Sequence, residues 1–333
     1  MKKTSVRDNI HKFSIYLILL AMFILCAIIN KNFLSARNLM NVARQLSVGT
    51  ILAYGEMLLV ISGLIDLSVG SVLALAGVLS ISAYQATGSL LIGFIVAIIV
   101  GVVCNFINAI LVTHFDVPAF IATLAMQMSA RGAALYYTKG QNLLQLKDYT
   151  IFGQGSIGPI PTPVIFMVVI TIITWYIMTH TRYGRSLYAI GGNEGAAVAS
   201  GINVKRNKYI TYIINGIFVG IAGVLFMSRV NAGLPNGAVG YEMEGLTATI
   251  VGGTSFSGGV GTTMGTLAGG FIIGFLNNIM NLTGVDSYIQ QIVKGIIIAG
   301  AVIMDIKSKN KKTAKVILAA DDAKKDEKKA EAK

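Results

Sequence analysis

Residues 181–208, TRYGRSLYAIGGNEGAAVASGINVKRNK, form a polar, basic segment rich in glycine and alanine. The apolar stretches on either side are long enough to cross a bilayer, so the segment is predicted to be a loop on one side of a membrane. Cytoplasmic loops carry an excess of Lys and Arg, and five such residues here indicate the cytoplasmic side. They are Arg182, Arg185, Lys205, Arg206 and Lys208.

The composition of the whole chain agrees with a membrane protein, since 54% of its 333 residues are hydrophobic and only 13% are charged. Breaks at glycine, proline and charged residues divide the chain into ten apolar segments. An even number of spans places both termini on the cytoplasmic side with the loop. The predicted fold class is therefore all-α, a polytopic integral membrane protein with about ten transmembrane helices. The predicted spans lie near residues 14–29, 46–62, 69–86, 90–113, 119–137, 163–180, 209–228, 245–259, 262–282 and 288–305.

A short internal repeat suggests how these spans are arranged. The pattern Phe106-x-Asn108-x-Ile110 recurs as Phe275-x-Asn277-x-Ile279, five predicted spans later. Because five is odd, the two halves would be inverted relative to each other, as in many transporters that build a central site at the repeat interface. The sequence therefore predicts two inverted five-helix repeats.

Residues 63–71, GLIDLSVGS, interrupt two apolar runs with glycines, hydroxyls and a carboxylate. One interpretation is a discontinuous segment inside the membrane, in which Asp66 and Ser68 satisfy backbone groups freed by the break. The other is an ordinary cytoplasmic turn capped by the same two residues. The sequence leaves both open.

A second glycine-rich interruption covers residues 252–261 and is followed by Gly265, Gly269, Gly270 and Gly274. Small residues at four-residue spacing let helices approach closely, so this pattern predicts helix packing. The sequence contains no Gly-x-x-x-x-Gly-Lys-Ser/Thr motif, and any ATP must be handled by another subunit. No catalytic residues and no metal-ligand pattern are predicted.

Four ionisable residues lie at predicted membrane depth: Glu56, Asp66, Arg131 and Lys294. Glu56 and Asp66 could form the acidic pair of an ion-coupled carrier, but structural pairing with Arg131 or Lys294 is the favoured interpretation. Four asparagines could bind a hydroxylated substrate, although hydrogen bonding between helices is the commoner use. They are Asn105, Asn108, Asn277 and Asn278.

The remaining polar regions lie outside the spans. Residues 139–162 and 231–244 are expected on the outer side as candidate docking surfaces. The charged tail at 307–333 is predicted to be a cytoplasmic, solvated or disordered end, apart from a transmembrane domain at 1–306. The net charge of +12 is assigned to cytoplasmic loops in contact with membrane lipid, and not to nucleic acid binding.

Nearly the whole chain before the tail resembles the permease subunits of ribose-type monosaccharide ABC importers, which are more distantly similar to branched-chain amino acid permeases. The matching motifs include SGLIDLSVGSVLAL at 62–75, VPAFIATL at 117–124, AIGGNE at 189–194, SGINV at 200–204 and GFLNN at 274–278. The resemblance implies a bacterial plasma-membrane permease that pairs as a homodimer. Its expected partners are a cytoplasmic ATPase subunit, which holds ATP and Mg²⁺, and an extracytoplasmic sugar-binding protein.

The resemblance also implies roles for particular residues. The loop at 181–208 looks like the coupling loop that meets the ATPase, with a short helix capped by Asn193 or Ser200. Its expected contact residues are Gly191, Gly192, Asn193, Ala196, Ala197, Ser200 and Gly201. The expected gate or translocation path comprises Asp66, Ser68, Gly70, Asn108 and Asn277. The residues do not identify the sugar, and an ion-coupled carrier or an amino acid or nucleoside permease stays an alternative.

Overall fold

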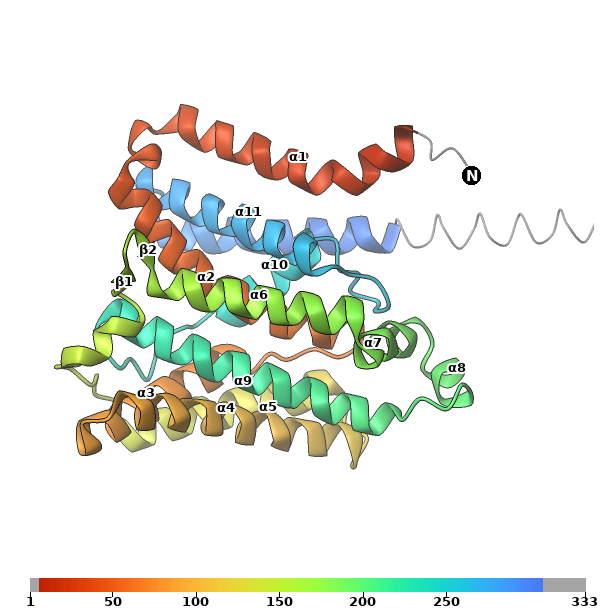
Figure 1. Ribbon diagram of the computed structural model, residues 1–333, viewed down its shortest axis with the longest axis horizontal. Helices are drawn as coiled ribbons and strands as arrows, with labels where there is room; N and C mark the ends of the chain where they lie inside the picture. The colour runs from red at the N-terminus through yellow and green to blue at the C-terminus, as the bar shows by residue number, and fades with distance from the viewer. Residues whose placement is uncertain (1–5, 308–333) are drawn as a thin grey trace, which may run out of the picture.

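The computed structural model of the protein describes residues 6–307, and in this part nearly all regular structure is helical (Figure 1). The helices are α1 (Val6–Ile29), α2 (Ala36–Ile61), α3 (Val69–Thr87), α4 (Leu90–Thr113), α5 (Ala119–Thr138), α6 (Thr162–His180), α7 (Arg182–Gly192), α8 (Glu194–Ala199), α9 (Val204–Val230), α10 (Tyr241–Val251), α11 (Thr263–Leu282) and a final helix, Ser287–Lys307. The 3₁₀ helices η1 (Lys31–Leu34) and η2 (Lys147–Phe152) and a hairpin of β1 (Ser156–Ile157) and β2 (Ile160–Pro161) complete it. The predicted tail from residue 308 on lies outside the described residues.

The all-α prediction is confirmed, and each of the ten predicted apolar segments contains a helix. Six helices of the described part are both long and apolar enough to cross a membrane: α3, α4, α6, α9, α11 and the final helix. One boundary prediction is wrong. The segment predicted at 245–259 is helical only to Val251, because the glycine loop, residues 252–262, turns away with Gly253 at φ +86°.

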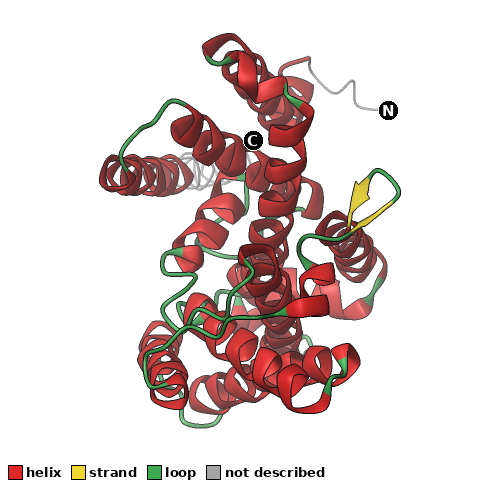
Figure 2. Cartoon of the chain, turned by 90° about the vertical axis from the view of Figure 1, so that its left-hand side faces the viewer, coloured by secondary structure: helices red, strands yellow, loops and turns green. Residues whose placement is uncertain are grey.

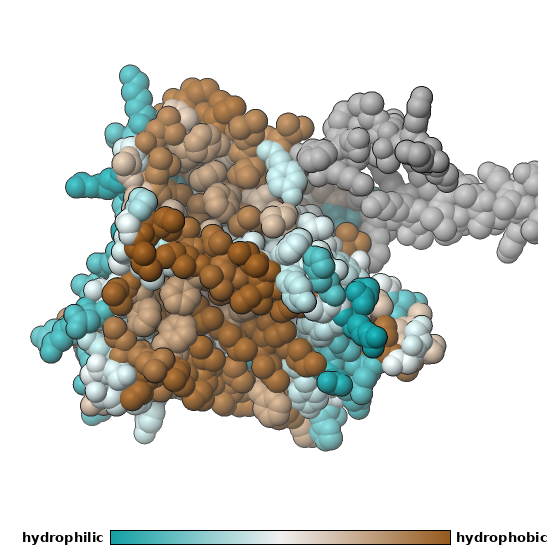
Figure 3. Space-filling model, viewed as in Figure 1, coloured by the Kyte–Doolittle hydropathy of each residue, from teal (hydrophilic) through white to brown (hydrophobic). Residues whose placement is uncertain are grey.

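The surface divides into a hydrophobic belt and two polar ends (Figure 3). Hydrophobic residues cover the middle of the view, and hydrophilic residues gather at its left and right edges. Helices α7 and α8, the start of α1 and the end of the final helix lie toward the right-hand end, while η2 and the hairpin lie at the left-hand end (Figure 1). The loop and the two ends of the described chain therefore share one side of the bundle, as an even number of crossings requires.

Helices α2 and α9 form the centre of the bundle. Every residue of α2 from 50 to 61 is buried, and α9 packs against α2, α3 and α4. Figure 2 looks along many of the helices and shows them side by side, with the hairpin at the edge. The second half of α2, which leads into the polar residues 63–71, is therefore enclosed by other helices on all sides.

Glycines set the closest helix contacts, as their spacing in the sequence predicts. Gly101 of α4 lies against the backbone of Gly216 in α9, and Gly269 of α11 lies against Ala248 of α10. Gly274 of α11 meets the side chain of Leu46 in α2. Close backbone approach through small residues is the main way that membrane helices gain packing energy, since lipid offers no hydrophobic driving force.

Replacing Gly216 with alanine should destabilise the bundle. Its added Cβ would lie 2.5 Å from the Gly101 carbonyl oxygen and 2.8 Å from the Val102 Cα, so α4 and α9 would have to separate. Overpacking of this kind costs ~1–3 kcal/mol. The unfolding midpoint of the purified protein in detergent should fall. Gly295→Ala is the matched control, because a Cβ there meets nothing within 4 Å, and an equal midpoint for the two variants would contradict the packing account.

Candidate functional site

The first break, residues 62–68, separates α2 from α3 inside the protein. Helix α2 ends where Gly63 adopts φ +79° and the Leu64 N–H bonds back to the Leu59 carbonyl at 2.8 Å. This pattern is the Schellman C-cap, which needs a left-handed residue. The chain then passes through buried Leu64, Asp66 and Ser68 before α3 begins at Val69. This burial supports the interpretation as a discontinuous segment over that of an ordinary solvent-exposed turn.

Asp66 is the centre of a buried hydrogen-bond network. Its Oδ1 accepts from the Ser68 backbone N–H at 2.7 Å and from the Ser68 hydroxyl, and its Oδ2 accepts from Asn215 Nδ2 at 2.8 Å. Asn215 also donates to Asn105 Oδ1 at 3.0 Å, while Asn108 Nδ2 donates to Ser68 Oγ at 3.1 Å. Each of these five residues, which we call the polar centre, is at most 1% exposed. The polar centre links the start of α3 to α4 and α9.

The second break, residues 231–240, joins α9 to α10 and also passes through the interior. Gly233, Pro235, Gly237 and Ala238 are buried. The expectation that residues 231–244 form an outer docking surface stays a prediction for the exposed residues, Asn231, Asn236, Val239 and Met243, while the buried ones face the protein. Irregular backbone at membrane depth must find partners for its polar groups within the protein or in a water-filled cavity.

Arg131 of α5 supplies part of that partnership. Its Nη1 donates hydrogen bonds to the carbonyl oxygens of Pro235 and Gly237, each at 2.7 Å. Gln127, one turn earlier, donates to Glu242 Oε1 at 3.3 Å. Two polar residues of α5 thus hold the second break and the first turn of α10 in place.

The starts of α3 and α10 meet. A Cβ on Gly70 would collide with the Glu242 carboxylate and the Ala238 carbonyl, so only glycine fits at this point. Glu242 Oε1 also accepts from the Gly240 N–H at 3.2 Å, in the first turn of α10. Carboxylates are stabilised near helix N-termini by the exposed N–H groups there. The contact between the starts of α3 and α10 therefore brings both discontinuous segments together.

Glu56 lies close to this junction but without the predicted partner. Its side chain is fully buried, neither carboxylate oxygen has a side-chain hydrogen-bond partner within residues 14–307, and its electrostatic neighbours are Asp66 and Glu242. Arg131 binds backbone carbonyls, and Lys294 pairs with Glu244. The expected pairing of Glu56 or Asp66 with Arg131 or Lys294 is therefore wrong.

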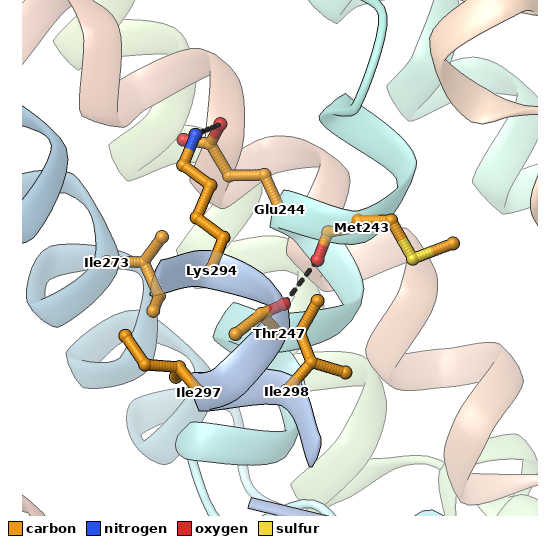
Figure 4. Close-up of a pocket in the computed structure, with 7 residues that line it drawn as sticks. All are labelled: Met243, Glu244, Thr247, Ile273, Lys294, Ile297 and Ile298. Carbon is orange, nitrogen blue, oxygen red and sulfur yellow. Dashed lines mark hydrogen bonds and ion pairs between the residues drawn. The ribbon is translucent and has the colours of Figure 1, made fainter. Parts of the chain in front are cut away.

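Lys294 and Glu244 form a separate cluster (Figure 4). Lys294 of the final helix reaches across to α10, where its Nζ lies 3.7 Å from Glu244 Oε2, and Asn277 of α11 donates to Glu244 Oε1 at 2.8 Å. The cavity between Lys294, Thr247 and neighbouring isoleucines measures only about 20 Å³. It holds about one water molecule and is too small for a sugar. Within the described residues, Asn277 donates to Glu244 and not to the polar centre, and its predicted place on a path with Asp66, Ser68 and Asn108 stays a prediction.

The loop at 181–208 folds into α7 and α8. Thr181 caps α7, and Tyr183 exchanges a hydrogen bond of 2.7 Å with Thr211 of α9. Burial raises the pKa of the Tyr183 hydroxyl, so that this group stays neutral. Leu187 and Ile190 lie on the buried face of α7. This amphipathic helix is therefore fixed against the membrane bundle.

Helix α8 projects away from the bundle (Figure 1). Asn193 accepts a hydrogen bond from the Ala196 N–H at 2.9 Å, which confirms its predicted N-cap role, while Ser200 stands at the C-terminal end. Ala196, Ser200 and Gly201 are exposed, whereas Ala197 faces inward. Ala197 packs in a small core with Ile190 and Val204. The exposed face of α8 carries small side chains together with the apolar Val198, which is 58% exposed.

Sequence reasoning missed Asn215 and Glu242. Asn215 was detectable as a lone amide within the apolar run at 209–228. Glu242 was visible in the sequence but was assigned to an outer loop, because nothing in residues 231–244 indicates that the chain turns back into the bundle. The predicted interhelical role of asparagine is confirmed at Asn278, which exchanges hydrogen bonds of 2.9 and 3.0 Å with Asn38.

Discontinuous segments that meet inside a helical membrane bundle are a feature of membrane transport proteins. The chain belongs to the family of branched-chain amino acid transport system permease components, whose model matches residues 38–302. It is 40% identical over 297 residues to the ribose import permease protein of Escherichia coli strain K12, covering 87% of this chain and 92% of that relative.

Two further relatives agree. The ribose import permease protein of Bacillus subtilis is 39% identical, with 88% of this chain and 92% of the relative covered. The D-allose transport system permease protein of E. coli K12 is 35% identical, with 90% and 91% covered. No solved structure matches the chain.

Proposed function

We propose that this chain is the membrane permease subunit of an ABC importer for a monosaccharide, ribose or a similar sugar. The observation that carries the proposal is its similarity, over nearly the full length, to ribose and allose import permeases. The permease performs no covalent chemistry of its own. An ATPase subunit on the cytoplasmic side would hold ATP and Mg²⁺, and the membrane domain would alternate between outward- and inward-facing states.

The ATPase is expected at α8. The exposed, small side chains of this helix leave room for a groove in a partner, and α8 is joined to the bundle through α7. The residues assigned to this coupling loop are Gly191, Gly192, Asn193, Ala196, Ala197, Ser200 and Gly201. Of these, Ala197 supports the helix from beneath. This assignment places the right-hand end of Figure 1, with both ends of the described chain, in the cytoplasm.

The sugar-binding protein is then expected at the opposite end, over η2 and the hairpin. Arg44 of α2 donates to the Gln154 carbonyl at 2.8 Å there, and so fixes the loop that precedes the hairpin. A second copy of the permease is expected beside α5. Ser129 and Gly132 are exposed on that helix, and nothing lies within 4 Å of a Cβ at Gly132. Small residues of this kind allow a second helix to approach closely.

We also propose that ten helices cross the membrane in two inverted repeats. Helix α4 packs against α9, and its counterpart in the repeat, α11, packs against α2. Each of the two long helices α2 and α9 is followed by a buried break and a shorter helix. Asn108 and Asn277, the repeated asparagines, both bind side chains close to a break.

The gate would lie where these breaks meet. The gate would include Asp66, Ser68, Gly70 and Asn108, which lie at or beside the start of α3. It would also include Asn277, which donates a hydrogen bond to Glu244 on α10. Specificity is expected to come largely from the binding protein, since the polar centre satisfies most of its own hydrogen bonds. The gate residues would then open and close the path without holding the sugar tightly.

Growth tests this function. The chain, expressed with its own ATPase and binding protein, should restore growth on one of ribose, allose or arabinose in a bacterium that lacks its permeases for those sugars. Restoration on a single sugar would name the substrate. Failure on every monosaccharide, together with restored uptake of a branched-chain amino acid or nucleoside, would contradict the sugar assignment.

A further inference from the structure

Three segments far apart in the sequence meet at the end of α2. Gly191, near the end of α7, lies against the carbonyl oxygen of Ile61, the last residue of α2. The same oxygen accepts a hydrogen bond of 2.8 Å from the N–H of Gly259 in the glycine loop. We call the contact of these three residues the glycine junction.

The glycine junction is made of backbone. A Cβ on Gly191 would collide with the Ile61 oxygen and would lie 2.6 Å from the Gly259 nitrogen. Gly258 has φ +81° and lies against Gly191, so this position also requires glycine. Contacts between backbones have no flexible side chain to absorb a displacement. A movement of one segment is therefore passed to the others with little loss.

Each segment leads to a different part of the proposed transport machinery. Helix α7 continues directly into α8, the proposed ATPase contact. Ile61 lies five residues before Asp66, at the entrance to the first break. The glycine loop joins α10 to α11, and α10 follows the second break and carries Glu242 in its first turn. The junction thus connects the coupling loop to both discontinuous segments.

Tyr188 makes a second connection between the same elements. Its hydroxyl donates to the Gly261 carbonyl at 2.9 Å, and a Cβ at Gly261 would lie 2.8 Å from the Ile61 side chain. Helix α8 also contacts α9 directly, through the packing of Ala197 on Val204 and through the exposed ion pair of Glu194 with Lys208 at 2.9 Å. Exposed ion pairs contribute little. Of the connections from α8, the one through α7 is the one that reaches the end of α2 and the glycine loop.

We infer that the glycine junction transmits the movement of α8 to both breaks, with Gly191 and Tyr188 as positioning residues for transport. This inference rests on the proposed function, and it adds the route by which ATP hydrolysis reaches the gate. Tyr188 belongs neither to the residues assigned to the coupling loop nor to the polar centre, so it acts only through the segments that it joins. Gly191 is assigned to the coupling loop, and the inference concerns its backbone contacts with Ile61 and Gly259.

Two variants test the route in proteoliposomes that contain the full importer. Gly191→Ala inserts a methyl group into the junction, and sugar transported per ATP hydrolysed should fall by at least about tenfold. Tyr188→Phe removes one hydroxyl without changing the packing, and the same ratio should fall about twofold to tenfold, the range set by one neutral hydrogen bond. For Tyr188→Phe, three quantities should stay close to the wild-type values: the ATPase activity, the amount of ATPase that co-purifies and the unfolding midpoint. Gly295→Ala is the control, because a Cβ there meets nothing.

The ratio of transport to hydrolysis separates the outcomes. A ratio equal to that of Gly295→Ala, for Tyr188→Phe and for any Gly191→Ala that assembles, would overturn the junction as the route. If Gly191→Ala does not assemble, Tyr188→Phe decides alone. Failure of the wild-type importer to couple ATP to uptake would instead refute the proposed function, which keeps the two failures distinct.

Discussion

Ala196→Arg should abolish ATP-driven transport while the membrane domain stays folded. Ala196 is exposed on α8, so a long charged side chain there does not disturb the bundle. It would, however, occupy the space that the small side chain leaves for the ATPase groove. A clash and an unpaired charge at the centre of an interface cost ~2 kcal/mol or more, which weakens ATPase binding by more than about tenfold. Uptake in proteoliposomes and co-purification of the ATPase measure the two effects.

The neighbouring alanine provides a contrast. Ala197 is 3% exposed and faces Ile190 and Val204, so Ala197→Arg should unfold α8 itself. Ala196→Ser keeps the side chain small and should retain most transport. Wild-type uptake by Ala196→Arg, with a normal amount of bound ATPase, would show that α8 is not the coupling surface.

Asp66→Ala should both destabilise the protein and stop transport. The change leaves the Ser68 N–H without its side-chain acceptor and removes one of the two acceptors of the Asn215 amide, and both residues are fully buried. Each buried unsatisfied group costs ~1–3 kcal/mol. The first break would lose the side chain that fixes the start of α3. The unfolding midpoint in detergent and uptake by the assembled importer should therefore fall together.

Asp66→Asn sharpens this prediction. An amide keeps one acceptor oxygen for Ser68, so Asp66→Asn should be less destabilising than Asp66→Ala. Asp148→Ala is a stability control, since its carboxylate lies exposed on η2. If Asp66→Ala melts at the same temperature as Asp148→Ala, the polar centre does not hold the break, and the account of the gate fails.

Much of the fold could be predicted from the sequence because apolar length alone defines a membrane helix. The exception at α10 has a physical cause. Its helix is short because the second break consumes chain length inside the membrane and the glycine loop then ends the helix early. The glycine-rich residues from 252 on mark the early end of the helix, but the residues at 245–251 carry no sign of the break that precedes it.

The candidate site was predictable in its residue types but not in its pairings. Asp66 and Ser68 were visible as polar residues between apolar runs, and Asn193 was visible as a helix cap. That Asp66 is held by Asn215, 149 positions later, depends on how α9 crosses α3 and α4. The inward orientation of Ala197 depends likewise on Ile190 and Val204. Long-range packing fixes these contacts, and one sequence does not contain it.

ATP-driven uptake of labelled sugar by proteoliposomes tests the central claim most directly. The vesicles would contain this chain, its ATPase and its binding protein, with ATP either inside or absent, and with or without an imposed proton or sodium gradient. The account predicts accumulation that requires both ATP and binding protein and does not respond to the gradients. Accumulation by the chain alone on an ion gradient would contradict it, and would make Glu56 and Asp66 the coupling site of a secondary carrier.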